Sequence, residues 1–184
     1  YGVYIVSVTN SVLLGCRPWK NCIKLRNYAT VLEISNNILD GGDYIIETVS
    51  TTSDKGFLIS NNIIRGAPKY GIKLYWSGVR IINNKFENND CDIVLYGDIS
   101  DIDIINNTFT STTRASFYRY DGVTTNINIS YNTWLDVDLS SYQMAMIGMG
   151  NNNDGSTNVY IGYNNFINTE ATVQIAIENA DNYI

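Results

Sequence analysis

An eight-residue pattern recurs six times along this chain of 184 residues. The pattern is hydrophobic-x-Ile-x-x-Asn-x-hydrophobic, and residues 32–39 form its first copy. We call the asparagine of each copy a ruler asparagine, and the six are Asn37, Asn62, Asn84, Asn107, Asn132 and Asn164. Consecutive members are 25, 22, 23, 25 and 32 residues apart. Self-similarity at so short and regular an interval is typical of repeat architectures.

The units contain strands and turns, and none has room for a helix. Between the copies lies a second apolar segment, such as Ile72-Lys73-Leu74, and no intervening stretch shows helical periodicity. The 25 asparagines and 25 isoleucines agree, because both residue types favour turns and strands over helices. Strand-only units of about 23 residues predict an all-β fold, a parallel β-solenoid with coils roughly 4.8 Å apart.

Stacked coils place equivalent residues on top of one another. We therefore expect the ruler asparagines to be structural and to form a buried ladder of amide hydrogen bonds. The isoleucines three residues earlier should form one interior column: Ile34, Ile59, Ile81, Ile104, Ile129 and Ile161. The apolar residues just beyond the turn should form another: Ile38 or Leu39, Ile64, Phe86, Phe109, Trp134 and Phe166.

The Ile-x-x-Asn-x-Phe unit, seen at residues 104–109, resembles the parallel β-helix repeat of the pectate-lyase-like superfamily. The resemblance covers residues 22–184 and implies a right-handed helix of three sheets, with residues 1–184 as one domain. Neither end shows a polar cap, so we expect the chain to be part of a longer protein. The superfamily includes lyases, hydrolases, epimerases, adhesins and viral tailspikes, so this fold alone does not determine the function.

Charge and composition narrow the functional classes. With a net charge of −6 and no basic cluster, the chain is not expected to bind nucleic acid. It has no run of about 18 uncharged apolar residues, so we expect no membrane insertion. Without histidine, the cysteines Cys16, Cys22 and Cys91 lack further ligands, and we expect no metal and no cofactor. Cys16 and Cys22 could form a disulfide, although three small buried cysteines are the favoured interpretation.

Three tyrosines recur 12 or 13 residues after a ruler asparagine: Tyr75, Tyr96 and Tyr120. With Trp76, they are predicted to line a shallow groove that holds an extended glycan, because sugar rings pack on aromatic rings. Asp98 and Asp121 would lie at its edge and accept hydrogen bonds from hydroxyl groups. The alternative is that the tyrosines pack on one another or against a partner subunit.

The same carboxylates are the candidates for catalysis. Glycoside hydrolysis requires two carboxyl groups, and Asp98 and Asp121 lie near Asp101 and Asp103 in the predicted coils. No active-site motif of the superfamily is recognisable around them. The outward position before each interior isoleucine forms a further column, in which Arg80 and Asp103 are expected to make a structural ion pair. The members of this column are Glu33, Leu58, Arg80, Asp103, Asn128 and Tyr160.

Two functions from different classes follow. We favour a surface-binding β-helix that resembles a bacteriophage tailspike or an extracellular adhesin, forms a homotrimer and binds a polysaccharide or cell-surface glycan. Its location would be extracellular or on a virion tail, and it could also cleave the polysaccharide that it binds. The alternative is a secreted polysaccharide lyase or glycoside hydrolase of the superfamily. The sequence leaves open whether the chain is an enzyme.

Overall fold

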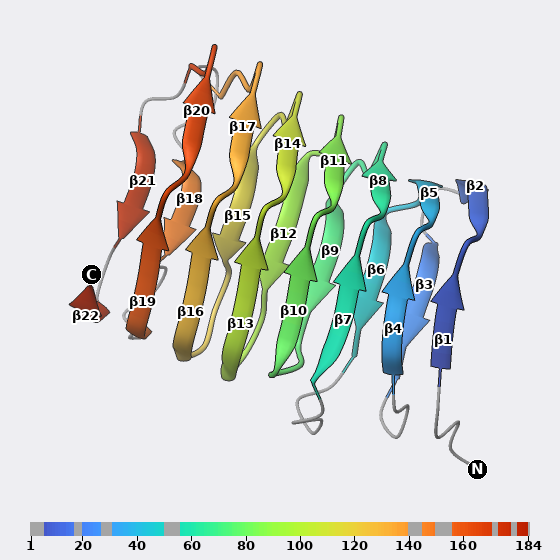
Figure 1. The fold of residues 1–184 in the computed structure, drawn as a ribbon, viewed down its shortest axis with the longest axis horizontal. Helices are drawn as coiled ribbons and strands as arrows, with labels where there is room; N and C mark the ends of the chain where they lie inside the picture. The colour runs from blue at the N-terminus through green and yellow to red at the C-terminus, as the bar shows by residue number, and fades with distance from the viewer. Residues whose placement is uncertain are drawn as a thin grey trace.

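A computed structural model describes residues 6–16, 20–26, 31–49, 56–139, 145–149, 156–170, 173–177 and 180–183. Within these ranges every regular element is a β-strand, which confirms the predicted all-β class. Strands follow one another in triplets, and each triplet adds one strand to each of three parallel sheets. In Figure 1 the chain ascends through two sheets in front, descends through the third behind them and advances one coil per turn, which makes the helix right-handed.

The first sheet contains β1 (Val6–Thr9), β4 (Val31–Ser35), β7 (Phe57–Ser60), β10 (Val79–Ile82), β13 (Ile99–Ile105), β16 (Thr124–Ser130), β19 (Ser156–Gly162) and β22 (Ala180–Tyr183). The second contains β2 (Val12–Cys16), β5 (Ile38–Gly41), β8 (Ile63–Arg65), β11 (Lys85–Glu87), β14 (Thr108–Thr110), β17 (Thr133–Leu135) and β20 (Asn165–Ile167). The third contains β3 (Asn21–Leu25), β6 (Tyr44–Thr48), β9 (Tyr70–Leu74), β12 (Cys91–Leu95), β15 (Ala115–Arg119), β18 (Ala145–Met149) and β21 (Val173–Ile177).

The predicted asparagine ladder is continuous at the corner between the first and second sheets. Each side-chain Nδ2 donates to the Oδ1 of the next ruler asparagine, over 2.9 Å from Asn37 to Asn62 and 3.1 Å from Asn132 to Asn164. The same Nδ2 also donates to a backbone carbonyl of the preceding coil, as from Asn84 to Ile59. These bonds satisfy polar groups that the stacked coils bury, which explains why the corner requires asparagine.

The interior columns also follow the predicted register. The isoleucines from Ile34 to Ile129 are fully buried, whereas Ile161, in the seventh coil, is half-buried. Leu39 is interior and Ile38 is half-buried, which decides between the two candidates for that position. Beyond the turn, the rings of Phe86, Phe109, Trp134 and Phe166 stack at centroid distances of 5.0, 4.9 and 4.8 Å.

The residue before each ladder asparagine adopts a left-handed backbone conformation. Asparagine tolerates this region better than bulkier residues do, and it fills the position in the earlier coils. In the sixth and seventh coils this position is instead occupied by Tyr131 and Tyr163, with φ values of 58° and 55°. The asparagines at this position are Asn36, Asn61, Asn83 and Asn106.

The cysteines correct the favoured interpretation. Cys16 at the end of β2 and Cys22 in β3 form a disulfide with a Cα–Cα distance of 5.5 Å. Cys16 ends β2 and Cys22 is the second residue of β3, and consecutive strands of one coil bring these two residues, six positions apart, within bonding range. Cys91 is the buried small residue that was expected.

Candidate functional site

The three predicted tyrosines stack on one another at the ends of consecutive strands of the third sheet. Tyr75, Tyr96 and Tyr120 each follow the last residue of β9, β12 and β15, so parallel pairing aligns them. Ring centroids are 5.1 Å apart between Tyr75 and Tyr96, and 4.6 Å apart between Tyr96 and Tyr120. We call these three residues the tyrosine ladder.

The stacking determines which parts of the rings can reach a ligand. Interplanar angles of 27° and 25° show that the rings face each other, so the ladder presents mainly ring edges and hydroxyl groups. Tyr75 and Tyr96 are half-buried, while Tyr120 is 44% exposed. Burial raises the pKa of Tyr96 most, and a hydroxyl–hydroxyl contact of 3.3 Å with Tyr70 raises it further. The Tyr96 hydroxyl group therefore remains a neutral donor and acceptor.

A lysine lies among these rings. The Lys73 Nζ is 5.1 Å from the ring centroid of Tyr75, 4.6 Å from that of Tyr96 and 4.8 Å from that of Tyr44. Its ion-pair partner is Glu47, whose Oε1 is 3.4 Å away. Burial alone would lower the pKa of Lys73, but the hydrogen bond with Tyr75 and the nearby negative groups raise it. A positive charge therefore lies beside the tyrosine ladder in cation–π geometry.

Trp76 does not belong to this surface, and its prediction as a groove residue was wrong. Its side chain is only 1% exposed and contacts the Phe57 ring edge-to-face at 5.8 Å. Tyr75, just after the end of β9, is half-buried at the edge of the core, and the next residue, Trp76, lies within the core. The predicted glycan contacts are thus reduced to the three tyrosines.

The predicted edge carboxylates hold the neighbouring turns together. The Asp98 Oδ1 accepts a hydrogen bond from the backbone N–H of Val123 over 2.8 Å. The Asp121 Oδ1 accepts one from the backbone N–H of Gly97 over 2.7 Å. Each carboxylate therefore links one coil to the next beside the ladder. A catalytic role for either one stays a prediction.

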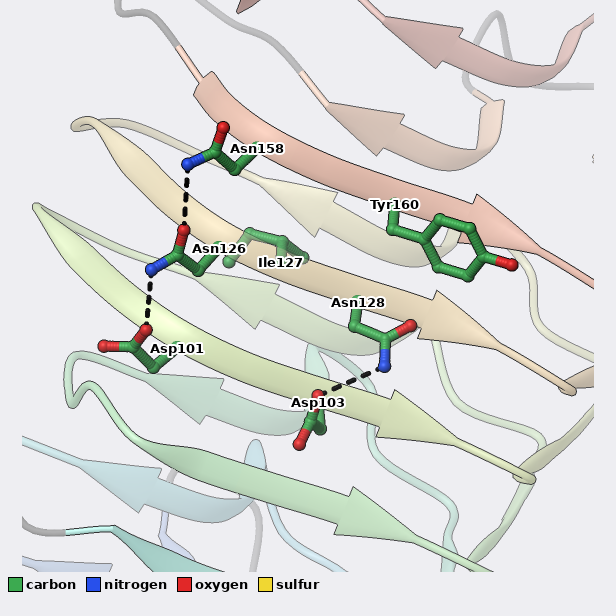
Figure 2. A pocket seen from close by; sticks show the side chains of 7 residues that line it. All are labelled: Asp101, Asp103, Asn126, Ile127, Asn128, Asn158 and Tyr160. Atoms are coloured by element: carbon green, nitrogen blue, oxygen red, sulfur yellow. Dashed lines mark hydrogen bonds between the residues drawn. The ribbon is translucent and has the colours of Figure 1, made fainter. Parts of the chain in front are cut away.

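A groove of about 380 Å³ lies on the outward face of β13, β16 and β19. Figure 2 shows polar side chains from these three strands lining it in two rows along the helix axis. One row contains Asp103, Asn128 and Tyr160, aligned by strand register as the outward column predicted. The other row joins Asn158 to Asn126 over 3.1 Å and Asn126 to Asp101 over 2.8 Å.

The ion pair expected in the same column is present. The Arg80 Nε lies 3.7 Å from the Asp103 Oδ2, and both side chains are largely exposed. Such a pair contributes about 0–1 kcal/mol to stability, in agreement with a structural role. Sequence reasoning thus found the column and the pair, but it did not find the groove that they border.

A buried carboxyl escaped the sequence analysis. Asp92 is fully buried at the start of β12 and accepts hydrogen bonds from Asn89 Nδ2 and Thr112 Oγ1 over 2.9 and 2.5 Å. Burial raises its pKa to about 7, although hydrogen bonds from Thr112, Asn89 and Ser116 oppose the rise. Strand alternation from Ile93 places Asp92 outward, so the sequence gives no signal for its burial. Its position in the interior prevents contact with a large substrate.

Among the residues that the structure describes, no group of three or more His, Cys, Asp or Glu side chains could hold a metal ion. The same part of the chain contains no helix long and apolar enough to cross a membrane.

Comparison with known proteins gives one result. The family model described as "Periplasmic copper-binding protein (NosD)" matches residues 1–151. No similar curated protein and no similar solved structure was found.

Proposed function

This chain belongs to the NosD family, and from this premise we propose that it is an exported β-helix protein that binds an extended glycan along the tyrosine ladder. The periplasmic description of the family supports a location outside the cytoplasm. The disulfide between Cys16 and Cys22 supports the same location, because disulfides persist in oxidising compartments.

The observation that carries the proposal is the unbroken stack from Tyr75 through Tyr96 to Tyr120 on an outward face. Hydroxyl groups repeat there once per coil, near 4.8 Å, which is close to the length of one sugar unit. They can donate hydrogen bonds to sugar oxygens and accept them from sugar hydroxyls. The exposed Tyr120 adds ring surface for apolar contact with a sugar.

The charge of the chain favours a neutral or amino-sugar polymer. A net charge of −6 repels anionic polysaccharides. Lys73, the cation beside the tyrosine ladder, is already paired with Glu47 and lies against the rings of Tyr75 and Tyr96. It is therefore poorly placed to bind a carboxylate of a uronic acid polymer.

The residues of this chain do not fit copper. Copper sites in proteins use imidazole, thiolate or thioether ligands, and the chain contains no histidine. Cys16 and Cys22 are joined in a disulfide, and burial raises the pKa of Cys91 to about 12, which disfavours its thiolate. Met146 and Met149 are buried in the core, and Met144 lies outside the described residues. Copper therefore has no part in the proposed function.

Glycan-array binding of the intact chain tests the proposal. The Tyr96→Ala, Tyr120→Ala double variant should lose binding, and the corresponding Phe variant should lose most of it because the hydroxyl groups are removed. Lys85→Ala, on the second sheet, serves as the surface control. Equal binding by the wild type and the double alanine variant, at equal thermal stability, would reject the proposal.

Light scattering on the same samples examines the alternative, in which the ladder contacts a partner subunit. A wild-type homotrimer that dissociates in the double alanine variant would assign the ladder to subunit contact. An unchanged oligomeric state together with lost glycan binding supports the proposed function.

A further inference from the structure

We infer that the groove on β13, β16 and β19 is a second ligand site, which binds a neutral saccharide between Asn128 and an exposed pair of tyrosines, Tyr131 and Tyr163. The groove lies on the first sheet and the tyrosine ladder on the third, so this inference does not depend on the function proposed for the ladder.

An acceptor in the groove lacks a donor. The Asn128 Oδ1 is buried and has no hydrogen-bond partner. The orientation of this amide is fixed, because its Nδ2 donates to the Asp103 Oδ1 over 3.2 Å and a flipped amide would set two acceptors against each other. A buried acceptor without a partner destabilises a protein and requires an explanation. A ligand hydroxyl that enters the groove and shifts the side chain of Tyr160 would reach this oxygen and supply the missing donor.

The rest of the lining matches a polyhydroxylated ligand. Hydrogen bonds from Asn126 and Ser100 lower the pKa of Asp101, so its carboxylate remains an acceptor at neutral pH. The amides of Asn126 and Asn158 provide donors and acceptors in the coils that follow. The carboxylates of Asp101 and Asp103 disfavour an anionic ligand. With a volume of about 380 Å³, the groove falls in the range of small-ligand sites.

The tyrosine pair supplies the aromatic surface that such a ligand requires. Tyr131 and Tyr163 stack at 4.9 Å with an interplanar angle of 9°, and they are 56% and 70% exposed. They occupy the left-handed corner position that asparagine fills in the earlier coils, where a bulky residue is unfavourable. Stacking offsets this cost and leaves both rings exposed, so the pair presents ring surface to a ligand.

Tyr160 connects the pair to the groove. It lines the groove, and a Cβ added at Gly162 would lie 2.4 Å from its hydroxyl oxygen, so the ring reaches along β19 toward the corner. Desolvation raises the pKa of Tyr160 most, and the nearby Tyr163 and Tyr131 raise it further. Three tyrosines and the polar rows thus form one continuous surface, with ring surface beside hydrogen-bonding groups as sugars require.

Two substitutions separate binding from folding at this site. Tyr163→Asn restores the residue type of the corner column, and Asn128→Leu removes the unpaired acceptor at similar volume. Binding to an array of neutral oligosaccharides is measured first, and the best binder is then titrated by calorimetry. Each variant should bind at least tenfold more weakly than the wild type, and Tyr163→Asn should keep or raise the melting temperature.

The outcomes distinguish the two sites. Wild-type affinity in both variants, or no wild-type binding to any neutral oligosaccharide, would overturn the inference. Binding that survives in the Tyr96→Ala, Tyr120→Ala variant and is lost in Tyr163→Asn supports the groove even if the ladder has no ligand. The reverse pattern supports the ladder alone and also overturns the inference.

Discussion

Asn107 donates from its Nδ2 to the Oδ1 of Asn132, 3.1 Å away in the next coil, and the same oxygen accepts the backbone N–H of Asn107 over 2.8 Å. Asn107 in turn accepts from the backbone and side chain of Asn84 over 2.8 and 3.1 Å. Each asparagine therefore joins three coils through one side chain. The ladder fixes the stacking register without any ligand.

Asn107→Ala should lower the free energy of unfolding by about 1–3 kcal/mol, because the backbone N–H and Nδ2 of Asn84 lose their shared acceptor in the interior. Urea unfolding measures the change. Glu33→Ala, at a half-exposed position of β4, is the control and should change stability by less than about 0.5 kcal/mol. A larger loss for Glu33→Ala than for Asn107→Ala would show that the inside–outside assignment is wrong.

Phe109→Ala should be more damaging, at about 3–5 kcal/mol, because it opens a cavity in the core. The Phe109 ring is fully buried between Phe86 and Trp134, at centroid distances of 5.0 and 4.9 Å. Phe109→Leu, which keeps most of the volume, should cost clearly less in the same urea experiment. Equal losses for the two variants would show that the lost ring volume is not the cause.

These two residues also show why the fold could be predicted. Asn107 and Phe109 belong to a motif with fixed internal spacing, and stacked coils convert equal spacing in sequence into contact in space. The tyrosine ladder and the Arg80–Asp103 pair followed from the same rule. Register was therefore the part of the structure that the sequence encodes most directly.

The predictions from sequence failed where the stacking register of the coils gives no information. Trp76 comes after the end of β9 but continues the inward alternation of Ile72 and Leu74, which its offset from the ruler asparagine does not reveal. Asp92 is buried and accepts hydrogen bonds from Asn89, three residues before it, and from Thr112, twenty residues after it, and these contacts do not follow from register. The disulfide depends on how closely the end of β2 and the start of β3 approach each other, which spacing in the sequence does not give. The groove arises from side-chain shapes across three strands, and spacing alone does not describe those shapes.

The oxidised chain should not bind copper stoichiometrically. Its three cysteines are either in the disulfide or buried as a thiol, and it lacks histidine. Dialysis against Cu(II), followed by elemental analysis, should leave much less than one copper per chain. The fully reduced chain is the matched comparison, because its free Cys16 and Cys22 thiols can bind Cu(I). One tightly held copper in an oxidised Cys91→Ala variant would contradict the assignment.

Stability should fall as pH rises from about 5 to 8, and Asp92 should be the cause. Its pKa is about 7 in the folded chain, against an ordinary value of 3.8. Between these two values the folded state holds a proton that the unfolded state has lost, so raising the pH favours unfolding until both states are ionised. The chain has no histidine, which removes the side chain that ordinarily titrates in this window.

Asp92→Asn should abolish this slope, because an amide resembles the protonated carboxyl and remains neutral at every pH in the window. The variant should therefore be more stable than the wild type at pH 8, measured by urea unfolding at several pH values. Asp101→Asn is the matched control. Hydrogen bonds lower the pKa of Asp101, so it is ionised throughout the window and its loss should leave the slope unchanged. A wild type that gains stability between pH 5 and 8, or an Asp92→Asn variant that keeps the slope, would show that Asp92 does not hold a proton in the folded chain.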